Sequence, residues 1–330
     1  MNATTEIERA AAGDAPKPRK RRRRWPAWTV VALLALWAVI RIGGWEQGSF
    51  PTQLMTVTPI GAGLAALTAL LSLLRRNRWA APAAALVCVA MVAVVVPRTV
   101  GAEQPAAKGA PLRVLSINLF GQADAKTVVD LVRKYDIEVF SALELTYDEA
   151  ARLDAAGLTQ LLPHRVSQAE ADVHGSGIYA KYPVTELPGL FTPLGPNMPA
   201  ATFTLPGGGK VEYVAIHPNP PLGRMEQEWN TNLRNLPSPS PSAVRVLAGD
   251  FNASLDHRSF RNLLDRGYVD AADQVGKGLI PTWPNNRSVI PPIISIDHVV
   301  ADRRVAVNRV EILDVPGTDH RGVFAELRLP

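Results

Sequence analysis

Cysteine is almost absent from this chain, and its scarcity excludes several kinds of chemistry. Cys88 is the only cysteine among the 330 residues, and it lies inside an apolar run. The chain therefore has no intramolecular disulfide, no cysteine-based zinc site and no credible thiol nucleophile. It also lacks the His-Glu-x-x-His pattern of zinc proteases and the Gly-x-Ser-x-Gly pattern of serine hydrolases.

Acidic residues are scarce in roughly the first hundred residues, which are rich in Ala, Val and Leu. Three apolar runs lie there, at about residues 25–45, 54–74 and 79–97. A helix of about 20 apolar residues crosses a bilayer, so we expect three transmembrane helices within residues 25–99. The alternatives are a cleaved signal peptide at the first run, or buried helices of a soluble protein. The two further runs, and the lack of a clear small-x-small cleavage site, disfavour the signal peptide.

The basic residues predict the orientation of these helices. Basic clusters occupy residues 17–24 and 75–78, whereas the chain between the first two runs carries few charges. Cytoplasmic loops are enriched in Lys and Arg, so both clusters are expected in the cytoplasm, which requires all three runs to cross. A basic run can also bind nucleic acid, but its position before an apolar run favours a cytoplasmic tail over residues 1–24. The protein is then a multi-pass protein of the cell membrane with an extracellular C-terminal domain.

A polar linker, residues 100–111, leads into the C-terminal domain, residues 112–330. Fully extended, the linker spans about 36–40 Å, so it would keep the domain near the outer membrane surface. The domain has numerous β-rich apolar runs with single helical patterns between some of them, which predicts an α+β or layered α/β fold of two packed sheets. The expected strands cover residues 112–118, 137–144, 176–184, 201–205, 211–217, 243–249, 293–301, 305–313 and 321–329.

Polar side chains occur where these strands end. They are Asn118, Glu144, His217, Asp250, Asn252, Asp297, Asp319 and His320. Strand alternation in the run VLAGDFN would point Asp250 and Asn252 to one side and Phe251 into the packing. Carboxylates and amides are ligands that Mg²⁺ prefers, and histidines beside carboxylates suit acid–base chemistry. One acid at a strand end is usually a turn former, but so many together indicate a site.

Seven motifs in the domain resemble the endonuclease/exonuclease/phosphatase (DNase I-like) superfamily. In chain order they are RVLSINL, FSALEL, GSGIYAKYPV, VAIHPNPP, VLAGDFNAS, SIDHVVAD and TDHRGVFAEL. GDFN and the last Asp-His pair are the most specific of them, and the resemblance covers nearly all of residues 112–330. It implies a four-layered α-β-β-α sandwich that hydrolyses a phosphate ester with Mg²⁺ or Mn²⁺.

The resemblance also implies a set of metal-binding residues. Glu144 would be the principal Mg²⁺ ligand, Asn118 would help to hold the metal or its waters, and Asp319 would touch the metal. The family often has Gln directly before the metal-binding Glu, whereas this chain has Leu143. The ligand is then kept while one polar neighbour is lost.

The catalytic residues implied by the resemblance are five. Asp250 and Asn252 would orient the attacking water and contact the phosphoryl oxygens. His320 would act as base or stabilise the pentacoordinate phosphorane, oriented by Asp297. His217 would be a candidate general acid.

Four other histidines are not assigned a role in the site, and three of them, His164, His174 and His257, match no motif position of the family. His298 follows the candidate Asp297, and we interpret it as part of the strand packing. His164, His174 and His257 are expected in loops or at the surface, with His174 near the mouth of the site.

The combination of basic tail, three spans and external domain resembles VanJ-type, teicoplanin resistance-associated membrane proteins. It predicts a membrane-anchored phosphoesterase acting outside the cell on a phosphodiester, phosphomonoester or pyrophosphate, including lipid-linked envelope substrates. An anchored extracellular nuclease is the alternative, but residues 112–330 show no concentrated Lys/Arg stripe. A non-catalytic binding module is less favoured, because the candidate site residues are all present. The partners expected are the substrate and the bilayer, with no protein partner inferred.

Overall fold

The computed structural model of the protein describes residues 25–286 and 290–330. The C-terminal part is an α/β domain with two six-stranded mixed sheets, in the orders β11-β12-β1-β2-β4-β3 and β5-β6-β7-β8-β10-β9. The strands are β1 (Pro111–Asn118), β2 (Val139–Leu143), β3 (His164–Gln168), β4 (Ser176–Ala180), β5 (Thr185–Glu186), β6 (Ala200–Thr204), β7 (Lys210–Ile216), β8 (Val244–Asp250), β9 (Tyr268–Asp270), β10 (Asp297–Asp302), β11 (Ala306–Leu313) and β12 (Gly322–Arg328). Nearly all of the expected strands are present, and the α/β class is confirmed.

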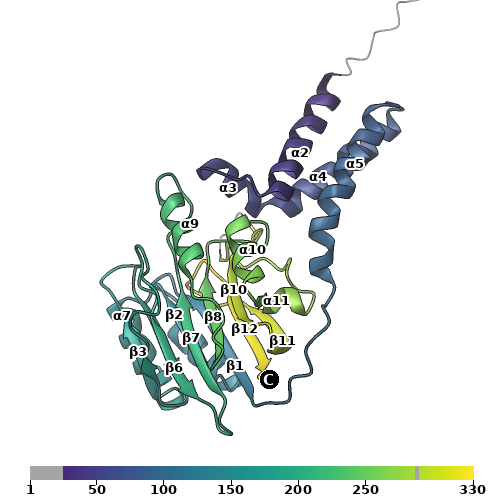
Figure 1. Ribbon diagram of the computed structural model, residues 1–330. Coiled ribbons are helices and arrows are strands. Elements are labelled where there is room, and N and C mark those ends of the chain that lie inside the picture. The colour runs from purple at the N-terminus through teal and green to yellow at the C-terminus, as the bar shows by residue number, and fades with distance from the viewer. Residues whose placement is uncertain (1–24, 287–289) are drawn as a thin grey trace, which may run out of the picture.

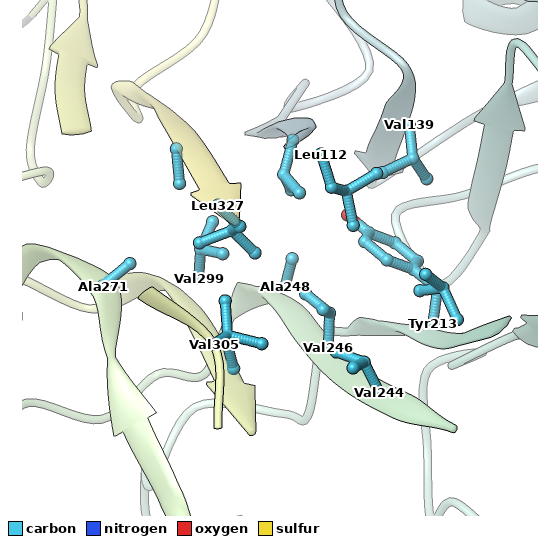
Figure 2. Packing of buried hydrophobic residues seen from close by; sticks show 14 of the residues in the cluster. Leu112, Val139, Tyr213, Val244, Val246, Ala248, Ala271, Val299, Val305 and Leu327 are labelled. Atoms are coloured by element: carbon cyan, nitrogen blue, oxygen red, sulfur yellow. The ribbon is translucent and has the colours of Figure 1, made fainter. Parts of the chain in front are cut away.

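The two sheets face each other across a buried apolar layer. Val114 and Val139 from the first sheet belong to the same buried cluster as Tyr213, Val246 and Ala248 from the second. Figure 2 shows several of these side chains converging between the strands. The alternating strand residues Leu115 and Leu247 belong instead to the outer clusters. Each sheet is therefore buried on both faces, as expected of a layered fold.

Helices form the outer layers. They are α6 (Ala125–Lys134), α7 (Tyr147–Ala155), α8 (Leu158–Leu161), α9 (Met225–Asn235) and α10 (Arg258–Asp265), whereas the short α11 (Ala271–Gln274) packs against the layer between the sheets. Helices α6 to α8 pack on the first sheet, and α9 and α10 pack on the second through Trp229 and Phe260. The order of layers is therefore helix, sheet, sheet, helix (Figure 1).

Strand register brings the candidate residues to one edge of the domain. The parallel strands β1 and β2 pair Asn118 with Leu143, so Glu144 follows at the same edge. In the other sheet, the antiparallel strands β8 and β10 pair Asp250 directly with Asp297. The ends of β1, β2 and β8 thus meet the start of β10. We call this edge of the domain, which carries Asn118, Glu144, Asp250 and Asp297, the polar edge.

In the part of the chain that the structure describes, four helices and one 3₁₀ turn precede the domain. They are α2 (Trp25–Gly43), α3 (Ser49–Thr56), α4 (Thr58–Leu74), α5 (Ala80–Val95) and η1 (Val96–Thr99). Among the described residues, Ala80–Thr99 is the one continuous helix long and apolar enough to cross a membrane. The pair Ser49–Thr56 and Thr58–Leu74 passes the test only together and is bent by 73°, while Ala27–Gly43 is shorter. The expectation of three spanning helices is therefore not confirmed, and the basic tail lies outside the described residues.

Residues 101–109 run along the C-terminal domain instead of hanging free. Gly101 forms a β-bridge with Val275. The backbone N–H of Gly109 donates to the carbonyl of Leu329 at 2.9 Å. The segment therefore reaches the edge opposite the polar residues before β1 begins (Figure 1). As a result, the polar edge of the domain lies on the same side as the N-terminal helices.

Replacing Gly249 by alanine is expected to lower the free energy of unfolding by about 3 kcal/mol. A Cβ atom at Gly249 would lie 1.9 Å from the carbonyl oxygen of Ile216 in the neighbouring strand, so the backbones of β7 and β8 would have to separate. Denaturant unfolding measures the change. Gly63→Ala is the control, because a Cβ at Gly63 would meet nothing within 4 Å. Equal stability of the two variants would contradict the close approach.

Candidate active site

Asn118 joins the two sheets at the polar edge. Its side-chain amide donates to Glu144 Oε1 at 2.9 Å and to Asp250 Oδ2 at 3.2 Å. The oxygen of the same amide accepts the backbone N–H of Phe120 at 3.0 Å. Glu144 has a positive φ of 50°, so the chain turns sharply there as β2 ends. Burial raises the pKa of Glu144, although the amide of Asn118 partly offsets that effect.

His320 lies between two buried carboxylates. Its Nδ1 is 2.9 Å from Asp297 Oδ2, and its Nε2 is 3.7 Å from Asp250 Oδ2. Burial lowers the pKa of His320, but the negative charges of Asp297 and Asp250 more than offset this and raise it to about 10. The imidazole is therefore protonated at neutral pH. Burial and the charge of Asp297 raise the pKa of Asp250 to about 7.

The GDFN turn differs in detail from the extended segment expected. Strand β8 ends at Asp250, and Asn252 has a φ of 48°, so alternation does not continue to Asn252. The backbone N–H of Asn252 donates to Asp250 Oδ1 at 2.8 Å, and its side-chain amide donates to the carbonyl of Pro218 at 3.0 Å. Phe251 is fully buried, as expected. Asn252 therefore connects the end of β8 to the loop that carries His217.

His217 faces Glu144 from the second sheet. Its Nε2 lies 3.6 Å from Glu144 Oε1, and its buried Nδ1 has no hydrogen-bond partner among the described residues. Burial and the positive charge of His320 lower its pKa to about 3. His217 is therefore neutral at neutral pH, which suits a hydrogen-bond donor better than the expected general acid.

The C-terminal Asp-His pair is held by two residues that the sequence did not identify. The hydroxyl of Thr318 donates to the carbonyl of Asn118 at 2.6 Å and accepts the backbone N–H of His320 at 3.1 Å. The indole of Trp283 donates to Asp319 Oδ2 at 3.2 Å, and Asp319 Oδ1 lies 4.0 Å from His320 Nε2. Thr318 directly precedes the Asp-His pair, which was the one available signal, whereas Trp283 comes from a distant loop.

The donor set fits a divalent cation. Ligand atoms of Asp250, Asp297 and His320 all lie within 4.8 Å of one another, and all three residues are buried. The carboxylate of Glu144 is connected to this set by the hydrogen bond from Asn118, and the carboxylate of Asp319 lies beside His320. Such a concentration of buried carboxylate oxygens is unfavourable without a compensating cation, and oxygen ligands are those that Mg²⁺ and Mn²⁺ bind. We favour the side of Glu144 and Asn118 for the ion, because His320 already bridges Asp297 and Asp250.

The remaining histidines lie outside this cluster. His298 is buried between the carboxylate of Asp270, at 2.8 Å from Nδ1, and the carbonyl of Ala253, at 2.8 Å from Nε2. His174 is exposed beside Asp172, and His164 begins β3. His257 was expected at the surface or in a loop, but it is fully buried beneath α3. His257 does lie in a loop, at the turn before α10, but it is buried there because the N-terminal helices cover this part of the domain.

The geometry combines a cluster of carboxylates with a charged imidazole and a neutral one. A comparison with protein families matches residues 115–320 to the Endonuclease/Exonuclease/phosphatase family. The chain belongs to this family. Its name covers nucleases and phosphatases, which are hydrolases of phosphate esters. The phosphoester chemistry expected from the motifs is therefore confirmed at the level of the family. None of the curated proteins matches the chain.

Solved structures of the family share the fold. The Beutenbergia cavernae endonuclease/exonuclease/phosphatase is 21% identical, with a TM-score of 0.55 over 66% of this chain and 72% of that one. D. rerio TDP2, complexed with a single-strand DNA product, is 18% identical, with a TM-score of 0.55 over 66% of this chain and 99% of that one. At these identities the likeness supports the DNase I-like fold and nothing finer.

Proposed function

We propose that the protein is a membrane-anchored, divalent-metal-dependent phosphoesterase whose active site is the cluster at the polar edge. The observation that carries the proposal is the hydrogen-bonded set in which Asn118 joins Glu144 to Asp250 and His320 joins Asp250 to Asp297. A binding module with no catalytic role would not need a protonated histidine buried among carboxylates. The family membership supports hydrolysis as the reaction.

Each residue has a role that follows from its position. Glu144 and Asp319 would hold Mg²⁺ or Mn²⁺, which would offset the negative charge of the phosphoryl oxygens, and the amide of Asn118 would orient the carboxylate of Glu144. The carboxylate of Asp250 orients the attacking water and accepts its proton, which its pKa of about 7 allows. Asn252 contacts a phosphoryl oxygen from the turn after β8.

The two histidines divide the remaining work. His320 is an imidazolium fixed by Asp297, so it stabilises the charge of the pentacoordinate phosphorane and is not available as a base. The neutral His217 donates a hydrogen bond from Nε2 to the leaving-group oxygen. Because Nδ1 of His217 has no hydrogen-bond partner among the described residues, the ring is oriented by packing and by Glu144, 3.6 Å from Nε2.

We further propose that α2, the bent pair α3–α4 and α5 each reach across the bilayer. The outer faces of these helices are apolar, since Leu33, Leu67 and Leu86 expose 62, 50 and 72% of their surface. Only 28% of the apolar window in Ala80–Thr99 is buried, whereas the core helix of a soluble protein would be mostly buried. With the basic residues 75–78 in the cytoplasm, the N-terminus is cytoplasmic and the catalytic domain is extracellular.

The orientation of the domain favours a substrate at the membrane surface. The polar edge lies on the side of the N-terminal helices, and Phe50 of α3 and Leu222 of the loop after His217 are both exposed beside it. This arrangement suits a phosphodiester, phosphomonoester or pyrophosphate of a lipid-linked envelope intermediate, and it is consistent with a role in glycopeptide (teicoplanin) resistance. The alternative is an anchored nuclease, favoured by the DNA product bound to the related D. rerio TDP2.

Full-length protein in detergent, with Mg²⁺ or Mn²⁺, is expected to hydrolyse undecaprenyl-linked pyrophosphate at least about tenfold faster than single-stranded DNA. Differential binding of the lipid portion supplies the preference. Phosphate or nucleotide release measures both reactions, with Glu144→Gln as the inactive control. Preference for DNA would support the nuclease instead. A reporter fused after Pro111 tests the topology separately, and a cytoplasmic signal would overturn the extracellular placement.

A further inference from the structure

A buried ion cluster fastens the N-terminal helices to the catalytic domain. Arg98 of η1 donates two hydrogen bonds to the carboxylate of Asp256, at 2.7 and 2.6 Å. Arg41 of α2 donates to the same carboxylate, and also to the carbonyl of Leu255 at 3.3 Å. Asp256 is 0% exposed, and the arginines are 7 and 6% exposed. Burying three charges is costly unless their geometry is well satisfied, so the cluster fixes one docked position.

The next residue makes a second connection. His257 Nδ1 accepts the backbone N–H of Ser254 at 2.8 Å, so its Nε2 carries the proton and donates to the carbonyl of Thr52 in α3 at 2.9 Å. The ring also lies edge-on to Trp229, with centroids 5.1 Å apart. Both hydrogen bonds require this tautomer, and together they hold Thr52 of α3 against the turn formed by Ser254 to His257.

The other active-site loop is also held by α3. The hydroxyl of Ser49 donates to the carbonyl of Pro221 at 3.0 Å and accepts the backbone N–H of Gly223 at 2.9 Å. This loop begins at His217 and continues through Pro218, whose carbonyl accepts the side-chain amide of Asn252. The N-terminal region therefore contacts two of the loops that carry candidate catalytic residues, the loop of His217 and the loop that follows Asp250.

The segment from Asp250 to Asp256 is held to the domain at several points. The carbonyl of Phe251 accepts the indole N–H of Trp229 at 3.0 Å, and the carbonyl of Ala253 accepts His298 Nε2 at 2.8 Å. Every residue from 250 to 257 is also at least partly buried. A shift at Asp256 would therefore have to be accommodated within this short packed segment, which begins at the turn that positions Asp250 and Asn252.

We propose that Arg41, Arg98 and Asp256 are positioning residues of the active site, so that the docked N-terminal helices complete the catalytic geometry. The inference rests on the proposed function for its kinetic part. It goes further in making the N-terminal region a component of the active site and not only an anchor. A misplacement of about 1 Å at a reacting group can cost on the order of 100-fold in rate, so a small shift of the turn is enough.

The test uses full-length protein in detergent and a generic phosphodiester with Mn²⁺, well below the unfolding temperature. Asp256→Asn and Arg98→Gln are expected to lower kcat about tenfold or more with little change in KM, because the chemistry is misaligned while substrate contacts remain. Arg98→Lys keeps the charge and should recover part of the loss. The matched control is Asp265→Asn, since Asp265 is an exposed carboxylate at the end of α10.

A second readout does not depend on activity. In protein labelled with 5-fluorotryptophan, the ¹⁹F resonance of Trp229, assigned through Trp229→Phe, should shift in Asp256→Asn and stay in place in Asp265→Asn. Ser49→Ala is a milder variant, expected to fold normally and to lower kcat about threefold.

The outcomes separate the two proposals. Unchanged kcat and an unchanged Trp229 resonance in folded Asp256→Asn would overturn the positioning role, leaving the cluster as a simple attachment. A fall in kcat that is fully explained by a smaller fraction of folded protein would also overturn the positioning role. Lack of hydrolysis by the wild-type protein would overturn the proposed function, while a shifted resonance would still support transmission from Asp256 to the turn.

Discussion

Glu144→Gln is expected to lower kcat/KM for a phosphodiester by about 1,000-fold, because the variant keeps the shape of the side chain but loses the charge that holds the cation. The amide of Asn118 donates to Glu144 Oε1, so the carboxylate is already oriented for ligation. The same substitution should weaken Mn²⁺ binding about 10- to 100-fold, measured by calorimetry. The two measurements together distinguish loss of metal from loss of fold.

The control for this variant is Glu186→Gln. Glu186 is an exposed carboxylate of the short edge strand β5, far along the second sheet from β8 and β10. It should keep full activity and unchanged affinity for Mn²⁺. If Glu144→Gln kept activity within about fivefold of the wild type, Glu144 would not be the principal ligand, and the set Asp250, Asp297 and His320 would replace it.

His320→Gln should also lower kcat by about 1,000-fold, and the pH profile of Asp297→Asn should reveal the reason. Burial lowers the pKa of His320, but Asp297 and Asp250 raise it to about 10. If the imidazolium stabilises the transition state, wild-type activity falls as the pH rises through about 10. Asp297→Asn removes the first of these charges and should move that fall to lower pH. Activity that instead increases through this pKa would make His320 a general base.

The raised pKa of His320 also predicts how the free energy of unfolding depends on pH. A folded-state pKa above the ordinary value means that His320 contributes stability that is complete below about pH 6.5 and is lost as the pH rises towards 10. Asp250 has a raised pKa of about 7, so its cost appears between about pH 4 and 7 and is constant above that. Denaturant unfolding between pH 8 and 9 therefore isolates His320, because Tyr179 and Tyr182, whose pKa values burial raises to about 12, add their own loss of stability only as the pH approaches 10. The slope should be absent in His320→Gln.

The strands and their polar ends were predictable because both depend on local sequence. Alternating or continuous apolar runs identify strands, and residues that end parallel strands must meet at one edge, so Asn118 and Glu144 could be brought together without coordinates. The turn at Asn252 was not predictable, since a left-handed φ at Asn leaves no periodic signal. The neutral state of His217 was not predictable either. It results from burial and from the positive charge of His320, which lies about a hundred positions away in the sequence.

The attachment of the N-terminal helices shows the same limit. Asp256 lies in a run, SLDHRS, that reads as an ordinary helix start, and Arg41 reads as a residue at the membrane surface. Their pairing spans 215 positions and appears only when both segments are folded. The bend between α3 and α4, in contrast, left a signal in the sequence, because Pro59 stands in the first turn of α4 and disfavours one continuous helix through this apolar run.

The path of residues 101–109 has a practical consequence for handling the protein. Pro111 of β1 pairs with Arg328 of β12, so the chain enters and leaves the catalytic domain at one edge, while Asn118 stands at the other end of β1. An eight-residue strand separates these edges by roughly 23 Å. A fluorescent protein or affinity tag fused behind Pro330 would therefore sit on the far side of the domain, where it can report on location in living cells without obstructing turnover.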